Sequence, residues 1–166
     1  MNFAIVYFSR SGHTKEMGEL IAKGLEKNSA QVRLFDMEQP ADADYINSCA
    51  GVIFGTPTYA ANVPWQVIRW FFEGCQGVNL AGKLGGMYSA AHYAQGGADV
   101  AIMSLVPELL VRGMLLYSGG SAYGKPILHL GPVALDSVEG HYEACKPEFE
   151  IFGERFAGKA AELFDK

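Results

Sequence analysis

The sequence has little cysteine, no long apolar run and no excess of positive charge, and each shortage excludes a class of protein. Three cysteines in 166 residues, with no C-x-x-C pair, indicate neither a disulfide framework nor a zinc site. No apolar stretch approaches the roughly 18 residues that cross a bilayer, so we expect no membrane span. The net charge of −5 gives no general attraction to nucleic acid or to anionic lipid. We therefore expect a cytoplasmic protein in which any bound anion is held by a local site.

Hydrophobic and charged residues, at 49% and 19%, are typical of one globular domain, and we place its bounds at residues 1–166. A chain of this size buries about 70% of its extended surface, which is enough for a core without disulfides. The first apolar segment, 3–8, is only six residues long and follows no basic residue. It is therefore expected to be a strand rather than a signal peptide.

Apolar segments alternate with helical patterns five times along the chain. We expect strands at 3–8, 32–35, 51–54, 84–89 and 114–117. We expect helices at 14–27, 42–48, 65–74, 99–111 and 147–164, the third opened by an Asn62 cap with Pro64 in its first turn. Strands so uniformly apolar belong in a parallel sheet that helices cover on both faces. The pattern thus predicts an α/β, doubly wound fold with a long loop at 118–124.

Three hydroxyls, a glycine and an arginine stand together where the first strand passes into the first helix, in the segment Ser9-Arg10-Ser11-Gly12-His13-Thr14. A helix N-terminus exposes unpaired N–H groups and roughly +0.5 of an elementary charge, which together favour a phosphate. Gly12 allows a sharp turn, and the hydroxyls can donate hydrogen bonds to anion oxygens. The alternative is a simple helix cap, for which one hydroxyl suffices. Three hydroxyls around a glycine favour the phosphate site.

Two more loops, 57–62 and 89–97, follow the third and fourth expected strands. Parallel sheets bind ligands beyond the carboxyl ends of their strands, at the point where the strand order reverses. Because all three loops lie at that edge, we expect them to form one site.

Other nucleotide-binding motifs are absent or incomplete. No G-x-G-x-x-G follows the first strand, so a Rossmann dinucleotide site has no support. The segment 119–125 does satisfy G-x-x-x-x-G-K, but Pro126 stands where a magnesium-binding hydroxyl is needed and no helix pattern follows. A receiver domain needs aspartates at the strand ends, where this chain has Ser9 and Arg10, then Thr56 and Pro57.

The remaining pattern resembles the flavodoxin fold family and, within it, the WrbA-type NAD(P)H:quinone oxidoreductases. The resemblance covers nearly the whole chain and rests on segments 7–14, 54–59 with Asn62, 95–97, and Gly113-Met114. It implies a flavodoxin-like, doubly wound five-stranded parallel sheet in three α/β/α layers. It also implies FMN as cofactor, NAD(P)H as reductant, and a quinone or similar flat acceptor as the small-molecule partner.

The resemblance assigns site residues by position. The FMN phosphate would be held by Ser9, Arg10, Ser11, Gly12, His13 and Thr14. The flavin ring would meet Pro57, Thr58, Tyr59, Ala60, Ala61 and Asn62 on one side and Ser89, Ala90, Ala91, His92, Tyr93 and Gly97 on the other. No metal ligands are implied. The groups available for acceptor protonation or nicotinamide binding are His92, Tyr93 and Arg112, although His92 is equally well interpreted as a solvent-exposed loop histidine.

Two segments depart from the family pattern. The segment 36–48 is short, and Val111 and Arg112 replace a pair of histidines. The first bears on whether the chain forms a homodimer or a homotetramer, and the second on the nicotinamide pocket. Two other functions stay open: a flavodoxin-type electron carrier and a flavin-free phosphate-binding domain. Because carriers are usually more acidic around the flavin and the third loop here is neutral, an enzyme is favoured over a carrier.

Overall fold

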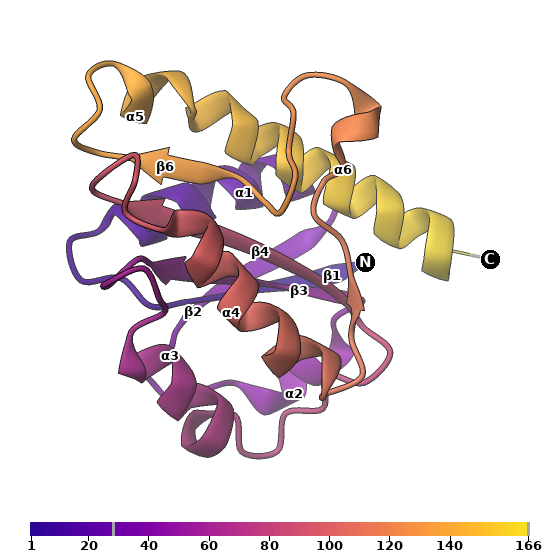
Figure 1. The fold of residues 1–166 in the computed structure, drawn as a ribbon. Helices are drawn as coiled ribbons and strands as arrows, with labels where there is room; N and C mark the ends of the chain where they lie inside the picture. The colour runs from indigo at the N-terminus through magenta and orange to yellow at the C-terminus, as the bar shows by residue number, and fades with distance from the viewer. Residues whose placement is uncertain (28, 166) are drawn as a thin grey trace.

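A parallel sheet forms the middle of three layers in the computed structural model, which describes residues 1–27 and 29–165 (Figure 1). The strand order is β2-β1-β3-β4-β5, and a further strand, β6, also pairs with β4. The strands are β1 (Asn2–Tyr7), β2 (Gln31–Asp36), β3 (Gly51–Pro57), β4 (Leu84–Ala91), β5 (Leu115–Leu116) and β6 (Val133–Leu135). Every pairing is parallel, which confirms the doubly wound α/β fold.

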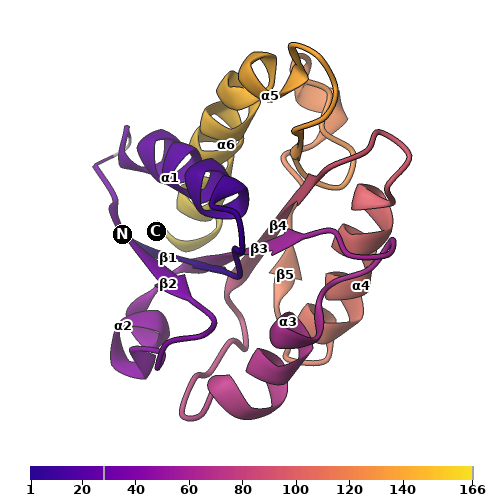
Figure 2. The ribbon, with the colours of Figure 1, turned by 90° about the vertical axis from the view of Figure 1, so that its left-hand side faces the viewer.

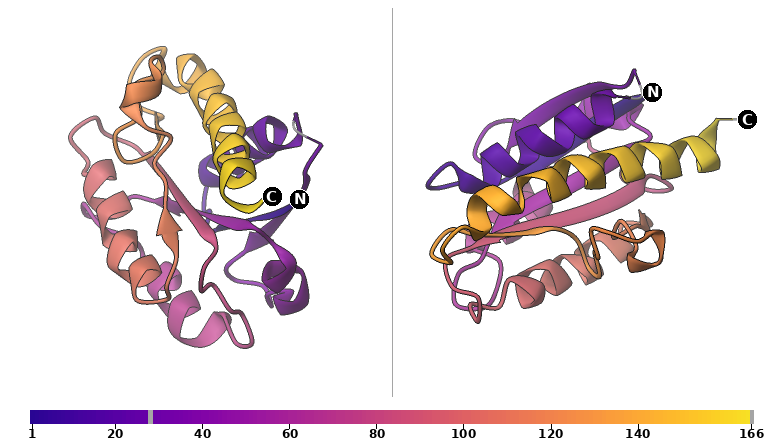
Figure 3. Two further views of the ribbon diagram at one scale, coloured as in Figure 1. Left: turned by 90° about the vertical axis from the view of Figure 1, so that its right-hand side faces the viewer. Right: turned by 90° about the horizontal axis from the view of Figure 1, so that it is seen from above.

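Helices cover both faces of the sheet. They are α1 (His13–Glu26), α2 (Ala43–Ser48), α3 (Trp65–Arg69), α4 (Ala98–Leu110), α5 (His141–Ala144) and α6 (Lys146–Phe164). Figure 2, which looks onto the carboxyl ends of the strands, shows α1, α5 and α6 on one side and α2, α3 and α4 on the other. From above, α1 and α6 lie alongside one another (Figure 3). The third expected helix reaches Gly74 as predicted, but its second half, Trp70–Gly74, is a π-helical turn.

The edge strand differs from the prediction because it is in two pieces. Only Leu115–Leu116 of the expected strand 114–117 pairs as β5, beside the start of β4. The chain then leaves the sheet and returns as β6 beside the end of β4, where Ser89 faces Val133. Three strand residues are too few to show an alternating pattern, which is why the sequence did not predict β6.

The excursion between the two pieces is organised around one cation. The Arg155 guanidinium of α6 donates hydrogen bonds to six backbone carbonyls, the shortest being 3.0 Å to Pro126 and to Lys125. A phosphate loop presents N–H groups to its ligand, whereas this segment turns its carbonyls toward a guanidinium. The G-x-x-x-x-G-K pattern at 119–125 is therefore a loop wrapped around Arg155.

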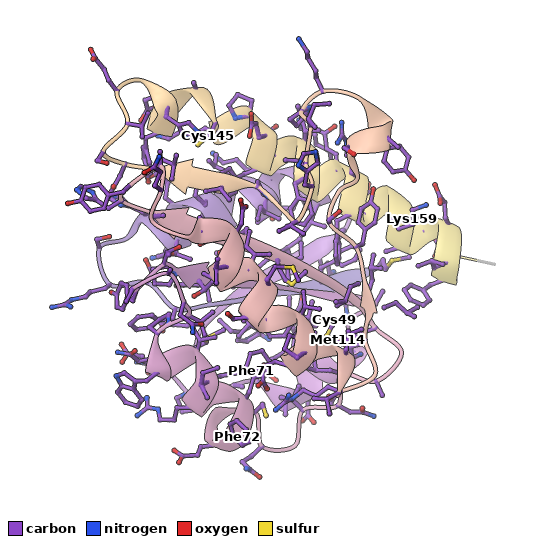
Figure 4. All side chains as sticks on the ribbon, in the orientation of Figure 1. Cys49, Phe71, Phe72, Met114, Cys145 and Lys159 are labelled. Carbon is purple, nitrogen blue, oxygen red and sulfur yellow. The ribbon has the colours of Figure 1, made fainter. Side chains whose placement is uncertain are left out.

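The two faces of the sheet bury separate apolar cores, and the three cysteines, all free thiols, divide between them. Cys145, the N-cap residue of α6, is buried in the core on the α1 and α6 side of the sheet, and Cys49 is buried in the core on the opposite side (both labelled in Figure 4). Cys75 is only half-buried. Within the described residues, every helix is too short or too polar to cross a membrane.

Tyr88 of β4 connects the sheet to the start of α1. Its fully buried hydroxyl donates a 2.9 Å hydrogen bond to the Thr14 carbonyl, and burial raises the pKa of Tyr88 so that the proton stays in place. Glycines leave room for the ring, since a Cβ at Gly55 would come within 2.2 Å of it and one at Gly18 within 2.6 Å of the hydroxyl. The sheet therefore fixes the first turn of α1, at the end of the segment 9–14 that is predicted to bind phosphate.

Replacing Tyr88 by phenylalanine removes this buried hydrogen bond while keeping the ring. We expect the free energy of unfolding to fall by about 1 kcal/mol, measured by urea denaturation. Tyr117→Phe is the matched control, because the Tyr117 hydroxyl is less buried and makes only a 3.5 Å contact with the Gly119 carbonyl. Equal losses in the two variants would contradict the anchoring role of Tyr88.

Candidate functional site

Three loops and the segment after β6 meet at the carboxyl edge of the sheet, the side that faces the viewer in Figure 2. Together they enclose a cavity of about 150 Å³. Its lining residues are Ser11, His13, Thr14, Pro57, Thr58, Tyr59, Ala90, Ala91, His92 and Asp136. All but Asp136 belong to the residues expected from the sequence. The other expected residues flank this cavity without lining it.

The first loop presents a set of backbone donors. Gly12 takes a left-handed conformation, with φ +95°, and immediately precedes α1. Within the described part of the chain, the structure records no acceptor for the backbone amides of residues 10–14. Gly12 occupies the N-cap position of α1, and the Oγ of Ser9, three residues earlier, accepts a 3.3 Å hydrogen bond from the Lys15 amide in the first turn. Arg10 is exposed, and the amides and hydroxyls that remain are suited to an anion.

The second loop contains a strained turn. Tyr59 and Asn62 exchange backbone hydrogen bonds of 2.8 and 3.0 Å, with Ala60 and Ala61 between them at φ +49° and +59°. The left-handed region costs an alanine roughly 1–2 kcal/mol, and such strain is concentrated at functional sites. The predicted Asn62 helix cap is wrong, because the turn holds Asn62 and Pro64 occupies the N-cap position of α3.

The third loop is joined to the second at two points. The buried Ser89 hydroxyl lies 2.9 Å from the Thr58 hydroxyl. Gly97, at φ +85°, packs against Ala61 so closely that a Cβ at position 97 would lie 2.4 Å from the Ala61 methyl group. The two loops expected to flank a planar ring therefore hold each other in place.

Asp136 brings the first and third loops together. Its carboxylate oxygens lie 3.0 Å from Nδ1 of His13 and 2.6 Å from Nδ1 of His92. Because β6 runs parallel to the end of β4, the residue after β6 emerges beside the residue after β4. The sequence analysis missed Asp136 together with β6, and the signal that could have found it is the short apolar run 133–135 ending at an acid. Tyr93, which is 65% exposed, sets its ring edge-on against His92 with centroids 4.4 Å apart.

Arg112, expected as an acceptor-binding or nicotinamide-binding group, is not available for that role. Its Nη1 donates to the carbonyl and carboxylate of Glu108 at 2.7 and 2.8 Å, and its Nη2 donates to the Phe71 carbonyl at 2.7 Å. The guanidinium also stacks over the Phe71 ring. Arg112 precedes β5, so it lies at the amino edge of the sheet, opposite the cavity. The expectation is therefore corrected: Arg112 holds α4 to the turn after α3.

A larger hollow, of about 480 Å³, lies at that amino edge. Its cation is Lys83, whose Nζ donates to the backbone carbonyls of Asn47 and Cys49 at 2.7 and 2.6 Å. Desolvation lowers the pKa of Lys83. This ammonium therefore caps the end of α2 and is engaged with carbonyls of the chain itself.

The residues of the carboxyl-edge cavity fit FMN by the chemistry of their donors. Unpaired amides and hydroxyls stand at the end of the cavity formed by α1, where a phosphate gains the helix field. Small and flat residues, Pro57, Ala90 and Ala91, form the walls beyond it, as close approach to a planar heterocycle requires.

Comparison with known proteins points the same way. The family model described as Flavodoxin matches residues 5–92. A Clostridium saccharobutylicum protein named Flavodoxin is 39% identical over 99% of this chain and 100% of its own length. A Geobacter sulfurreducens protein named NAD(P)H dehydrogenase (quinone) is 27% identical over 96% of this chain and 95% of its own. The solved structure of a WrbA-like flavodoxin from Agrobacterium tumefaciens has a TM-score of 0.73 at 23% identity, covering 97% of this chain and 98% of that one.

Relief of the strained turn provides a test of the second loop. Asparagine adopts the left-handed region more readily than alanine, so Ala60→Asn should raise the free energy of unfolding by about 0.5 kcal/mol. Ala94→Asn, in an exposed part of the third loop outside the left-handed region, should leave it nearly unchanged. Thermal or urea unfolding measures both, and a loss of stability in Ala60→Asn would contradict the strain.

The contact between loops is tested with two left-handed glycines. Gly97→Ala and Gly82→Ala both pay the backbone penalty, but a Cβ at Gly82 meets no atom within 4 Å. Overpacking typically costs 1–3 kcal/mol, so we expect Gly97→Ala to lose about 1–3 kcal/mol more stability than Gly82→Ala. Equal urea midpoints for the two variants would show that the loops do not press on each other.

Proposed function

The chain belongs to the flavodoxin family, and from that premise we propose that it is an FMN-dependent oxidoreductase that passes two electrons from NAD(P)H to a quinone or similar flat acceptor. The observation that carries the proposal is the His92–Asp136 pair at the rim of the cavity. A carrier of single electrons needs no proton donor beside its flavin. Reduction of a quinone to a hydroquinone takes two electrons and two protons. The hydride from NAD(P)H brings both electrons and one of the protons, so one more proton has to come from a donor at the site.

The chain's own residues would hold the cofactor. The amides of residues 10–14 and the hydroxyls of Ser11 and Thr14 would bind the phosphate at the N-terminus of α1. Pro57, Tyr59 and Ala90 would exclude water from the planar part of the ligand. When bound, FMN supplies the redox chemistry, taking two electrons from reduced nicotinamide and passing them to the acceptor.

His92 would move the proton. Its Nδ1 lies against the Asp136 carboxylate, which fixes the orientation of the ring and leaves Nε2 as the nitrogen that can donate to an acceptor oxygen. The His92 side chain is 58% exposed, so it can be reprotonated from solvent after each turnover. Tyr93, packed against it, restricts the imidazole on one side.

The second candidate is a flavodoxin-type electron carrier. It is favoured by the 39% identity with the Clostridium saccharobutylicum protein named Flavodoxin, which extends over the full length of that protein. The loss of Arg112 as a candidate also removes one cation that could have bound the nicotinamide phosphate. The two functions differ in whether the protein accepts electrons directly from NAD(P)H.

Steady-state oxidation of NADH and NADPH by the FMN-loaded protein, with a soluble quinone, separates these functions. We expect turnover without any added protein and a kcat on the order of a hundredfold lower in His92→Gln, because general acid catalysis is lost. The visible spectrum of bound flavin should be unchanged in this variant. His129→Gln, at an exposed histidine outside the cavity lining, should match the wild type.

Two results would count against the enzyme. Oxidation of NAD(P)H only after a separate reductase is added, together with a stable one-electron stage during stepwise reduction, would identify a carrier. A purified protein that is colourless and binds no added FMN would reject both functions.

A further inference from the structure

We propose that Asp136 is a specificity-determining residue that limits how strongly the site prefers a phosphorylated flavin over an unphosphorylated one. Its carboxylate stands where it competes with the flavin phosphate for His13 and adds a negative charge beside the phosphate site. The proposal rests on the proposed function, in that the cavity is taken to bind FMN.

Asp136 lies at the end of the cavity where α1 begins. Its Oδ2 is 3.0 Å from Nδ1 of His13, and His13 is the first residue of α1, whose backbone amide is one of the free donors at the helix N-terminus. Asp136 also lines the same cavity as Ser11 and Thr14. A phosphate bound by these residues is therefore close to a carboxylate of this chain, and the two anions share one imidazole.

The segment that carries Asp136 is fixed by its backbone. The Asp136 amide donates to the Ala91 carbonyl at 3.1 Å, and the amide and hydroxyl of Ser137 both donate to the His92 carbonyl. These bonds continue the pairing of β6 with β4. These bonds fix the backbone at Asp136, and the contacts of its carboxylate with His13 and His92 direct the side chain into the cavity, beside any phosphate that enters.

Charge balance distinguishes Asp136 from the other acid near this helix end. Glu16, in the first turn of α1, is paired with the permanent cation Lys146 at 2.7 Å and accepts a hydrogen bond from Tyr142, and these contacts lower the pKa of Glu16. Asp136 is instead paired with two histidines, which are cations only when protonated. Above the range in which histidines titrate, the charge of Asp136 is therefore not balanced by its partners.

The sign of the effect follows from the charges. Asp136→Asn removes one negative charge beside the phosphate site, so it strengthens phosphate binding. The test is best made above about pH 8, where histidines as a class are uncharged and the carboxylate is the charge that changes.

Flavin binding to the full-length apoprotein tests the proposal. Dissociation constants for FMN and riboflavin are measured by flavin fluorescence at about pH 8.5. In Asp136→Asn we expect FMN to bind on the order of tenfold more tightly and riboflavin to change by less than about twofold. Glu26→Gln, at the opposite end of α1, makes the same change in net charge and should leave both constants within about twofold of the wild type. Asp136→Ser serves if the asparagine variant fails to fold.

The possible results distinguish a failure of the proposed function from a failure of the inference about Asp136. Wild-type protein that binds neither flavin would overturn the proposed function and the inference together. Wild-type protein that binds FMN, with an unchanged FMN-to-riboflavin ratio in Asp136→Asn, would leave the function intact and overturn the inference. Equal weakening of both flavins would also overturn it, because Asp136 would then only hold the loops together.

Discussion

The parallel pairing of β1, β3, β4 and β6 is the constraint on which the rest of the structure depends. Parallel strands release their following segments at one edge of the sheet, so four segments far apart in the sequence meet there. The first contributes the N-terminus of α1, the second a strained turn, the third His92 and the fourth Asp136. The amino edge receives Lys83 and Arg112, each bound to backbone carbonyls of the chain itself. Free donors are therefore found at the carboxyl edge.

How much of the fold and of the candidate site the sequence predicts depends on how long each apolar or polar segment is. The four strands expected at 3–8, 32–35, 51–54 and 84–89 lie close to their observed bounds, because short apolar runs are typical of a buried parallel sheet. The sequence predicts a phosphate site at segment 9–14 because hydroxyls and a glycine gather there at the start of a helix. Because this segment lies between β1 and α1 at the carboxyl edge, three of its residues, Ser11, His13 and Thr14, line the cavity.

Three features differ from the prediction: the divided edge strand, the start of α3 and the place of Arg112. Each has a cause in hydrogen bonds that a sequence pattern does not record. The edge strand is divided because Arg155, some 29 to 36 residues further along the chain, holds the excursion at its carbonyls. Asn62 does not cap α3 because its backbone is paired with Tyr59 in the turn just before the helix, and Pro64 occupies the N-cap position. Arg112 was considered near the site from its place in a family pattern, whereas its hydrogen bonds to Glu108 and Phe71 hold it at the far edge. The outcomes at Arg155 and Arg112 depend on tertiary contacts, and the outcome at Asn62 depends on a turn within its own loop.

A protein with a net charge of −5 has to attract an anionic ligand by local means. The unpaired backbone amides at the start of α1 are suited to this, because they carry no formal charge and are not neutralised by the surrounding acids. Beside these amides, the Asp136 carboxylate contacts both His13, at the start of α1, and His92, at the rim of the cavity. In the proposed function, the group that orients His92 for proton donation also reduces the attraction for the phosphate. A firmly held cofactor and an oriented acid are then opposing requirements at Asp136, and a change that favours one of them acts against the other.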